Sequence, residues 1–554
     1  MRRKLQRYLI LSFYLVLSAI MYISLKRNIV LNGDDIYFQF QRIMGLSDNF
    51  IKDLSPNVSI SNFGKIGYGV HIFYPWITMM PFGIVYLLTN NWISAYYLGL
   101  LFFIFVSFGI SHYSMKRFTD STKSALIFSV IYNFSIYRLI DISTRGAVAE
   151  YIATIFLPLC FLGFYELFFG KNNSWKVLAI GMSAIILTHV LTTFMCVIIF
   201  VLLLMALSFK LKVTRRKMFN LGKAIIATLG TTLVYIVPFI MEELFQKYGT
   251  PDPQPLKGLD LTKLIYASLI NNSQRTATGN VYNVGLTIVI AIVLGVLFFK
   301  KFDFRYKAIF ISLVGTFLLT TNLVPWHIFQ NTPISVIQFP FRFLMFTTLF
   351  GSIVLTQTLK VVFDTHKMVN FIIVLAVLTL STGGLWINSI HYSLKDPGLV
   401  SPNNVITQKM VRDRTIPDSY LDQYVPVSGH KKLNSVIRHE LFLNNKKIIQ
   451  TPKLKGKNNV FVIENVKKGD KIDIPFIKYK YTQTRFNNRL VHTNLSNRDS
   501  IRFVAPKSAR KVIIELSYGN KGLLIFSLLI SIVAWIYLLF SHTLIRFIKG
   551  EMNN

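Results

Sequence analysis

The sequence is poor in charged residues, and above all in acidic ones. Only 15% of its 554 residues are charged, and 25 Asp and Glu stand against 60 Lys and Arg. Soluble globular proteins carry about 25% charged residues, so this composition excludes an ordinary soluble domain. There are only two cysteines, Cys160 and Cys196, and each lies inside an apolar run. Two such cysteines exclude a disulfide framework and a cysteine-based zinc site.

Several catalytic motifs are also missing from the sequence. It contains no phosphate-binding glycine loop, no nucleophile elbow and no HExxH zinc motif. Nucleotide chemistry on the cytoplasmic side therefore has no motif to support it. We expect an enzyme built from this chain to use a substrate that is already in the membrane.

What the sequence does contain is a series of long apolar runs. Hydrophobic residues make up 52% of the chain, and the mean hydropathy is +0.47. Several runs approach the roughly 20 residues that cross a bilayer as a helix. The net charge of +35 does not indicate a nucleic-acid partner, because the basic residues form short clusters between apolar runs, as the positive-inside rule distributes them. The sequence predicts a polytopic α-helical membrane protein in contact with membrane lipids.

The basic clusters also predict the topology. The cluster Arg2, Arg3, Lys4 and Arg7 places the N-terminus in the cytoplasm, ahead of an uncleaved first span. Alternation then gives about twelve transmembrane helices and a cytoplasmic C-terminus. The expected spans are residues 8–25, 92–113, 122–138, 149–169, 176–189, 191–209, 223–241, 282–300, 307–323, 343–360, 369–388 and 522–543. The apolar segment 72–89, with Pro75 and Pro81, is expected to be a membrane-surface or re-entrant helix, which implies a cavity.

Three domains follow from this pattern. Residues 1–388 form the transmembrane domain, with an outer loop at 26–91. Residues 389–519 are polar and contain alternating runs such as NNVFVIENV, KIDIPFIKYKY and KVIIELSY, which are typical of strands. They predict an extracytoplasmic β-rich domain. Residues 520–554 form the final transmembrane helix and a cytoplasmic tail.

Unusual polar residues gather on the predicted outer face. Ionisable groups at membrane depth are costly and usually line a cavity or a pathway. The surrounding loops, such as IQFPFRF and GVHIFYPW, are aromatic and apolar, which indicates buried or interfacial backbone. The residues are Asp34, Asp35, Arg42, His71, Arg138, Asp141, Arg145, Glu150, His189, His327, Gln338 and Arg342.

Each of these residues has a structural and a functional interpretation. Asp34 and Asp35 either cap a helix that begins at Ile36 or supply a general base for an acceptor hydroxyl. Carboxylates also suit a divalent metal, but no metal-binding spacing is visible, so the sequence leaves any cofactor unknown. Arg342, between two phenylalanines, either binds a phosphate or extends to lipid headgroups.

The other candidates are equally open. Arg145 and Glu150 are five residues apart and could simply pair with one another. His71 and His189 are either satisfied polar groups or ligands.

Four motifs together carry a resemblance to a known family. They are GDD after the first span, RGAVAEY followed by LPL, LTHVLTT, and SVIQFPFRFL. The chain resembles, over about residues 1–390, the bacterial membrane proteins labelled 6-pyruvoyl-tetrahydropterin-synthase-related. That family is similar in architecture to YfhO-type membrane proteins and to the GT-C glycosyltransferase superfamily. Nothing in the chain resembles the soluble pterin enzyme or its zinc histidines.

The GT-C resemblance implies a polyprenyl-phosphate-linked sugar as donor and a catalytic aspartate in the first outer loop. Asp34 or Asp35 would be that residue. Arg145 and Arg342 are then candidates to hold the lipid phosphate. The remaining candidate substrate-binding residues are His71, His189, Glu150 and Gln338.

The expected function is transfer of a sugar to a cell-envelope glycan or glycolipid at the outer face of the cytoplasmic membrane. A transporter or flippase of lipid-linked saccharides and a non-catalytic scaffold for envelope assembly are the alternatives. A flippase would need charged residues along a path deep inside the spans. The sequence has few, of which Glu166 is the nearest, and this favours the enzyme.

Overall fold

The computed structural model describes residues 2–53, 57–170, 174–210, 213–251, 254–275, 281–364, 368–401, 405–519 and 521–548. Residues 549–554, the end of the predicted cytoplasmic tail, lie outside this set. The chain divides into two compact units. The first unit comprises Met1–Ile36, Thr89–Ile226 and Pro253–Val411. The second unit comprises Tyr37–Leu88, Ala227–Asp252 and Arg412–Asn554.

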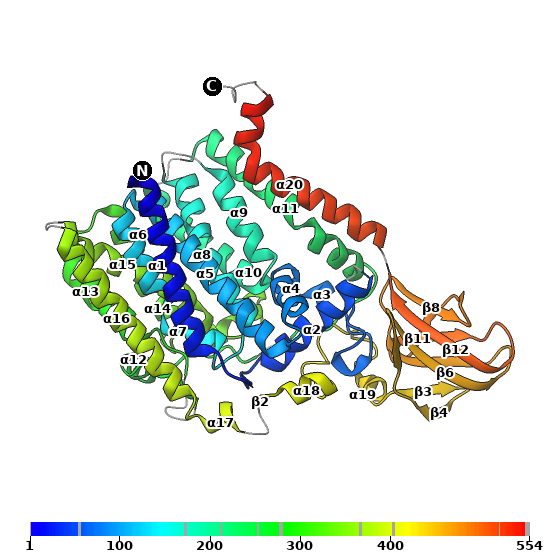
Figure 1. Cartoon of the computed structure of the whole chain (residues 1–554). Helices are drawn as coiled ribbons and strands as arrows, with labels where there is room; N and C mark the ends of the chain where they lie inside the picture. Colours follow the sequence, from blue (N-terminus) through cyan, green and yellow to red (C-terminus); the bar gives the residue numbers. More distant parts are fainter. Residues whose placement is uncertain are drawn as a thin grey trace. The chain divides into compact units, whose positions relative to one another are not determined.

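The first unit is a bundle of apolar helices (Figure 1). Long apolar runs form helices in a membrane protein because a helix satisfies its backbone hydrogen bonds internally. The helices are α1 (Arg2–Leu25), α5 (Trp92–Thr119), α6 (Thr122–Asn133), α7 (Ile136–Ile142), α8 (Val148–Phe168), α9 (Trp175–Ile186), α10 (Val190–Ala206), α12 (Leu261–Leu269), α13 (Gly285–Phe298), α14 (Phe304–Leu319), α15 (Leu344–Asp364), α16 (Met368–Ser393) and α17 (Pro397–Val400). Helix α11 (Arg215–Glu243) begins in this unit and continues into the second.

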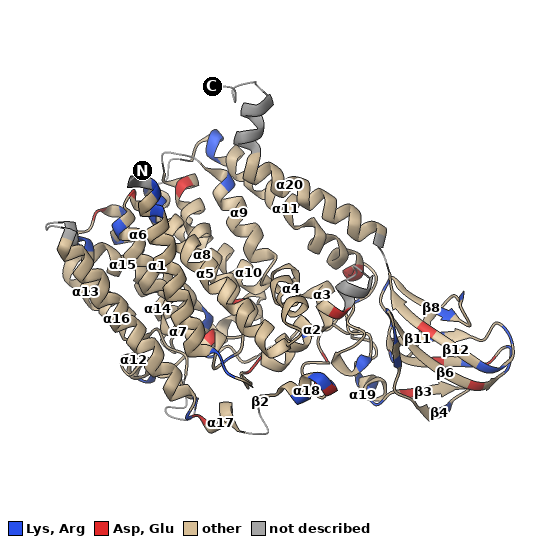
Figure 2. Ribbon diagram, viewed as in Figure 1, with Lys and Arg blue, Asp and Glu red and all other residues tan. Residues whose placement is uncertain are grey.

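Every one of the twelve predicted spans contains a helix, but their lengths differ. Within the described residues, seven helices are long and apolar enough to cross a membrane, or eight if the bent pair α6 and α7 is one span. The four remaining predicted spans form α9, α10, α13 and α14, which are 12 to 17 residues long. Figure 2 shows that the long helices are almost free of charge along their length, with Lys and Arg gathered near helix ends.

Side-chain caps fix several helix starts in the first unit. Asn91 accepts a hydrogen bond from the backbone N–H of Ser94 at the start of α5, and Ser121 accepts one from Ser124 at the start of α6. Caps of this kind satisfy N–H groups that have no partner inside the helix. Two short strands, β1 (Val30–Leu31) and β2 (Val405–Ile406), pair antiparallel. They tie the segment after α1 to the segment after α17.

The second unit begins with a broken set of short helices. Helix α2 (Ile36–Asp53) starts at the boundary, and α3 (Val70–Phe73), the 3-10 turn Ile77–Met79 and α4 (Met80–Thr89) follow. The segment 72–89, predicted to be a surface or re-entrant helix, is therefore divided among these pieces. Ile77–Thr89 is apolar but shorter than a membrane span.

The rest of the second unit is a β-sandwich followed by a long helix. Three of its strands coincide with the alternating runs of the sequence, so the predicted β-rich domain is confirmed. One sheet has the order β10-β11-β7-β3-β4 and the other β5-β6-β12-β8-β9, and both contribute to one apolar core. The strands are β3 (Glu440–Leu443), β4 (Lys446–Ile449), β5 (Lys453–Lys455), β6 (Asn458–Val466), β7 (Lys471–Ile477), β8 (Thr482–Phe486), β9 (Arg489–Leu490), β10 (Asn494–Leu495), β11 (Ser500–Val504) and β12 (Ala509–Tyr518). Helices α18 (Gln408–Asp413) and α19 (Leu433–Ile437) precede them, and α20 (Lys521–Ile548) follows.

A buried glutamate joins the sandwich to the membrane helices of the second unit. Glu242, at the end of α11, accepts hydrogen bonds from the hydroxyls of Tyr248 and Tyr518 at 2.7 and 2.9 Å and from the backbone N–H of Lys480 at 3.0 Å. The backbone N–H of Val234 in α11 donates to the hydroxyl of Ser531 in α20 at 3.0 Å. These contacts hold the last strand and the final helix against α11.

Candidate functional site

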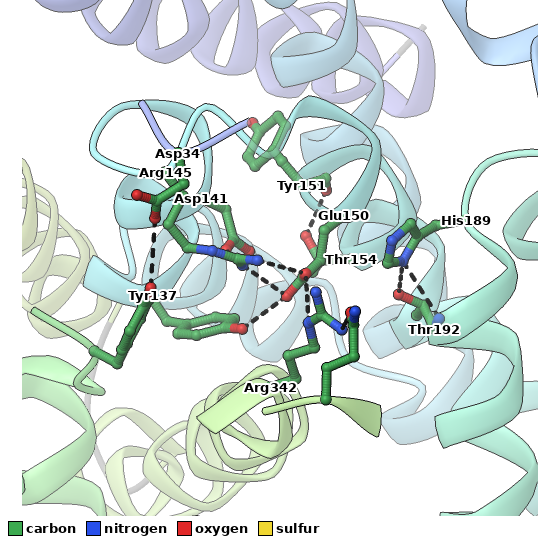
Figure 3. A network of polar contacts seen from close by, with 12 residues as sticks. Asp34, Tyr137, Asp141, Arg145, Glu150, Tyr151, Thr154, His189, Thr192 and Arg342 are labelled. Carbon is green, nitrogen blue, oxygen red and sulfur yellow. Dashed lines mark hydrogen bonds and ion pairs between the residues drawn. The ribbon is translucent and has the colours of Figure 1, made fainter. Parts of the chain in front are cut away.

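Two arginines lie against one buried carboxylate in the first unit. Glu150 lies in the first turn of α8 and is 2% exposed. Its carboxylate accepts a hydrogen bond at 3.0 Å from Nη2 of Arg145 and one at 2.8 Å from the hydroxyl of Tyr137, and it is ion-paired with Nη1 of Arg145 at 3.0 Å. The Nε of Arg342 lies 3.4 Å from the same carboxylate. Figure 3 shows the two guanidinium groups approaching Glu150 from different directions.

Arg145 is the most strongly held cation of this cluster. Its Nη1 also lies 2.6 Å from Oδ1 of Asp141, and its guanidinium lies 5.1 Å from the ring of Phe341. The ring of Phe341 stacks on that of Tyr282, with centroids 3.5 Å apart. Burial alone would lower the pKa of Arg145, but Glu150 and Asp141 raise it well above its ordinary value. Arg145 is therefore a permanent cation in a largely apolar setting.

A glycine turn places Arg145 beside the cluster. Helix α7 ends at Ile142, and the chain turns through Gly146, whose φ is +66°. The N–H of Arg145 donates to the carbonyl of Ile140, and that of Ala147 donates to the carbonyl of Asp141. A position with positive φ after a helix is usually occupied by glycine, because glycine has no Cβ. The sequence RGAVAE is therefore a helix-ending turn followed directly by the start of α8.

The same turn receives the segment that contains Asp34 and Asp35. A Cβ at Gly33 would overlap the backbone of Arg145 and Gly146, and a Cβ at Gly146 would lie 2.8 Å from the Cβ of Ile36. The backbone N–H of Asp35 donates to the carbonyl of Arg145 at 2.9 Å. The glycines of NGDD and RGAV thus allow the two backbones to pack directly against each other. This contact brings the two aspartates next to the arginine cluster.

Asp34 is engaged by a cation and a tyrosine. Its Oδ1 lies 2.6 Å from Nη2 of Arg275, and the hydroxyl of Tyr282 donates to its Oδ2 at 3.4 Å. The same Nη2 donates to the carbonyl of Thr144 at 2.6 Å. Burial raises the pKa of Tyr282 to about 12, so this hydroxyl keeps its proton at neutral pH. Asp34 therefore helps to hold the segment in place.

Asp35 has a different environment. Its side chain is half-buried and makes no hydrogen bond or ion pair with any residue that the structure describes. Burial raises the pKa of the Asp35 carboxyl, Arg145 and Arg342 oppose the rise, and Asp34 and Glu150 add to it. Although Asp35 precedes α2 directly, its side chain does not accept from the first N–H groups of that helix.

Arg342 lies at the start of the α15 span, in the 3-10 turn Pro340–Phe343. Its Nη1 donates to the carbonyl of Ile337 and to Oε1 of Gln338, both at 3.0 Å. Across the described ranges, no partner is found for its Nη2.

His189 is the N-cap of α10, where Nδ1 lies 2.7 Å from the hydroxyl of Thr192.

The family assignment comes from a family model that matches residues 73–389, more than half of the chain. The model is described as a 6-pyruvoyl-tetrahydropterin synthase related domain and a membrane protein. The chain belongs to this family of membrane proteins. The predicted family is therefore confirmed. The match to the PTPS-related model contains Arg145, Glu150, His189, Gln338 and Arg342, whereas Asp34, Asp35 and His71 precede it.

Two further likenesses are weaker. An uncharacterized protein of Lactococcus lactis subsp. cremoris is 25% identical over 181 residues, which is 31% of this chain and 29% of that protein. A solved structure of the mycobacterial arabinofuranosyltransferase AftD is 14% identical with a TM-score of 0.45, covering 68% of this chain and 26% of AftD. The chain thus spans less than a third of the length of either protein.

The structure of this PTPS-related protein gathers most of the predicted site residues and separates the rest. Asp34, Asp35, Arg145, Glu150, Gln338 and Arg342 form one cluster in the first unit. His71 and Arg42 belong to the second unit, where Nε2 of His71 lies 3.2 Å from the carbonyl of Arg42. His327 is exposed. Arg138 is buried and bonded to the neutral side chains of Ser107, Asn133 and Thr154.

Three residues of the site have no sequence signal in this family member. Tyr137, Tyr282 and Arg275 contact the cluster, but nothing in their local sequence marks them. Arg275 lies in the long loop before α13, far in sequence from Asp34. Among the described residues, no group of three or more His, Cys, Asp and Glu is arranged to hold a metal ion.

Proposed function

We propose that the protein is a membrane glycosyltransferase of the GT-C type. It transfers a sugar from a polyprenyl-phosphate-linked donor to a cell-envelope glycan or glycolipid at the outer face of the cytoplasmic membrane. The observation that carries the proposal is the position of Asp35. Its carboxylate, which has no hydrogen-bonding partner among the described residues, lies beside the buried cations Arg145 and Arg342, at the ends of apolar helices.

Asp35 is the general base of this proposal. A base must be able to take a proton, so a carboxylate already engaged by a cation is less suited to the role. Asp34 is ion-paired to Arg275 at 2.6 Å, whereas the Asp35 carboxylate has no such partner in the described chain. Burial raises the pKa of Asp35, and a higher pKa makes a stronger base. Asp34 is the positioning residue, because its contacts with Arg275 and Tyr282 hold the NGDD segment.

Arg342 is the residue that binds the donor phosphate. Arginine suits a phosphate because it presents parallel N–H donors to the oxygens. Nη2 of Arg342 has no partner among the described residues, and the contact between its Nε and Glu150 is long at 3.4 Å. Arg145 makes three shorter contacts with Asp141 and Glu150. We therefore assign Arg145 to positioning Asp35 and Glu150, and Arg342 to the leaving phosphate.

The reaction follows from these positions. Asp35 takes the proton of the acceptor hydroxyl while that oxygen forms a bond to the anomeric carbon of the donor sugar. The bond between the anomeric carbon and the phosphate oxygen breaks, and its electron pair leaves with the polyprenyl phosphate. Arg342 stabilises the negative charge that develops on the phosphate. The base and the cation are thus both supplied by one cluster.

The test compares two adjacent substitutions in cells. A deletion strain is complemented with wild type, Asp35→Asn or Asp34→Asn, and envelope glycans are measured by mass spectrometry at equal protein levels. Asp35→Asn is expected to reduce transfer about 10²- to 10⁴-fold, the contribution of a general base. Asp34→Asn removes a partly exposed ion pair worth about 0–1 kcal/mol, so a loss of roughly fivefold or less is expected.

A matched control is Asp120→Asn, an exposed aspartate between α5 and α6. It is expected to behave like wild type. If the Asp35→Asn strain makes the same glycans in the same amounts as wild type, the enzyme proposal is wrong.

A further inference from the structure

A second candidate site lies in the β-sandwich. A cavity of about 560 Å³ opens between α19, the turn before it, and the strands β3, β7 and β11. Ligand-binding cavities of proteins usually measure about 300–1,000 Å³. All of its lining residues belong to the second unit. The cavity has no part in the site described above.

The lining of this cavity is strongly basic. Five exposed cations surround it: Lys431, Lys432, Arg438, Lys471 and Arg502. None of the five side chains makes an ion pair or hydrogen bond with a residue that the structure describes. The two acidic residues of the lining are already engaged, Asp473 by Arg498 at 2.5 Å and Glu440 by Lys447 at 3.5 Å. An uncompensated positive field of this size attracts anions.

A buried arginine forms the floor of the cavity. Arg498 is 4% exposed and donates to the carbonyl of Glu440 at 2.7 Å and to the hydroxyl of Ser435 at 3.1 Å. Its guanidinium lies 4.7 Å from the ring of Phe442. These contacts join β3, α19 and the turn before β11 around one buried side chain. The exposed cations therefore surround a buried arginine that is bonded to two elements of the sandwich.

The uncharged lining residues suit a saccharide. Asn434, Asn445 and Asn497 line the same cavity and are exposed. A carboxamide both donates and accepts hydrogen bonds, which matches sugar hydroxyls. The half-buried ring of Phe442 adds an apolar surface. We propose that this cavity, the basic cleft, binds a strand of acidic glycan that carries carboxylate or phosphodiester groups.

The arrangement favours a glycan over a membrane lipid. A lipid-docking surface combines cations with exposed apolar side chains that enter the acyl region. The cleft residues are cations and carboxamides, and its single aromatic ring is half-buried. The cleft is formed on the sheet β10-β11-β7-β3-β4, whereas α20 follows β12 of the other sheet. The proposal does not rest on the proposed glycosyltransferase activity.

The test measures glycan binding by the full-length protein. The chain is purified in an uncharged detergent, and fluorescence anisotropy follows two labelled acidic chains of equal length. One is a polygalacturonate oligosaccharide and the other a phosphodiester-linked saccharide, with dextran of the same length as the neutral reference. Wild type is expected to bind at least one acidic chain and not dextran. Binding is expected to be lost at about 1 M salt, where the Debye length falls to about 3 Å.

Two triple variants make the result specific. The first variant combines Lys432→Gln, Arg438→Gln and Arg502→Gln. It is expected to weaken binding about 3- to 150-fold, because each exposed charge contributes roughly 1.4- to 5-fold. Lys453→Gln, Lys507→Gln and Lys511→Gln remove the same charge from exposed positions outside the cleft and are expected to change binding less than about twofold.

Three results would overturn the proposal. They are no binding of either acidic chain by wild type, an equal loss in both triple variants, and tighter binding to phosphatidylglycerol vesicles through the same three residues. The last result would make the cleft a lipid-docking surface instead.

Discussion

Replacing Glu150 by glutamine would test whether the arginine cluster depends on one buried charge. Glu150→Gln keeps the size of the side chain and an oxygen for the hydroxyl of Tyr137. It removes the negative charge that Arg145 and Arg342 share. Arg145 would still face Asp141, but Arg342 has no other carboxylate within 4.0 Å among the described residues. The substitution therefore leaves a cation in a buried site without its counter-ion.

The expected loss of stability is large for a single substitution. Removing one partner of a buried ion pair costs about 3–5 kcal/mol, because the remaining charge stays desolvated. The glutamine oxygen retains part of the hydrogen bonding, so we expect the lower end, about 3 kcal/mol. Each kcal/mol of lost stability lowers the unfolding temperature of a unit this large by roughly 1–2 °C. The midpoint of thermal inactivation should therefore fall by about 4 °C.

The assay is thermal inactivation of the detergent-purified protein, followed by size-exclusion chromatography of the remaining monodisperse fraction. Glu166→Gln is the matched control, because Glu166 lies in the same helix α8. Its carboxylate pairs with Arg117 at 2.6 and 2.8 Å, but the Arg117 side chain is 32% exposed. Solvent therefore screens that pair, and a shift of about 1 °C is expected. A shift for Glu150→Gln no larger than that for Glu166→Gln would refute the reasoning.

Two further predictions concern the NGDD segment. Gly33→Ala should abolish transfer while the protein still inserts, because the added Cβ would overlap the backbone of Arg145. The control is Gly109→Ala in α5, where a Cβ has open space. Equal glycan levels from both variants would contradict the packing argument. Because the folded protein raises the pKa of Asp35 and the base must be unprotonated, kcat/KM should fall as the pH drops through a value above the ordinary aspartate pKa of about 3.9. A pH profile of the purified enzyme measures this, and a limb at or below about 3.9 would contradict it.

Much of the fold follows from local patterns in the sequence. Apolar runs such as Trp92–Thr119 form helices because only an internally bonded backbone is stable in lipid. Strands such as Asn458–Val466 follow from alternation, because one face of each sheet packs on the core. The features of the motif RGAVAE are also local. Its glycine suits a backbone position with positive φ, and its glutamate lies in the first turn of the next helix.

The details of the site could not be predicted, because they depend on contacts between distant segments. Arg275 reaches Asp34 across 241 positions of sequence, and Tyr282 stacks on Phe341 from another helix start. The two aspartates are adjacent and chemically identical in the sequence. Only the folded chain distinguishes them, by giving Asp34 a cation and leaving Asp35 half-buried. The pairing of Arg145 with Glu150 was an open alternative, and it coexists with the cluster.

The charges of the cluster explain how it could bind a phosphate although its arginines already lie against carboxylates. The carboxylates of Asp141 and Glu150 lie against Arg145, and that of Glu150 also lies against Arg342, so both buried arginines have a counter-ion. A counter-ion matters because an isolated buried cation would be costly. A donor phosphate would have to compete with Glu150 for an arginine. Arg342, with its 3.4 Å contact and an Nη2 that has no partner among the described residues, can exchange partners at less cost than Arg145, which is held by three contacts of 3.0 Å or less. In the proposed reaction, the same carboxylate would keep Arg145 fixed beside Asp35 while Arg342 binds the phosphate.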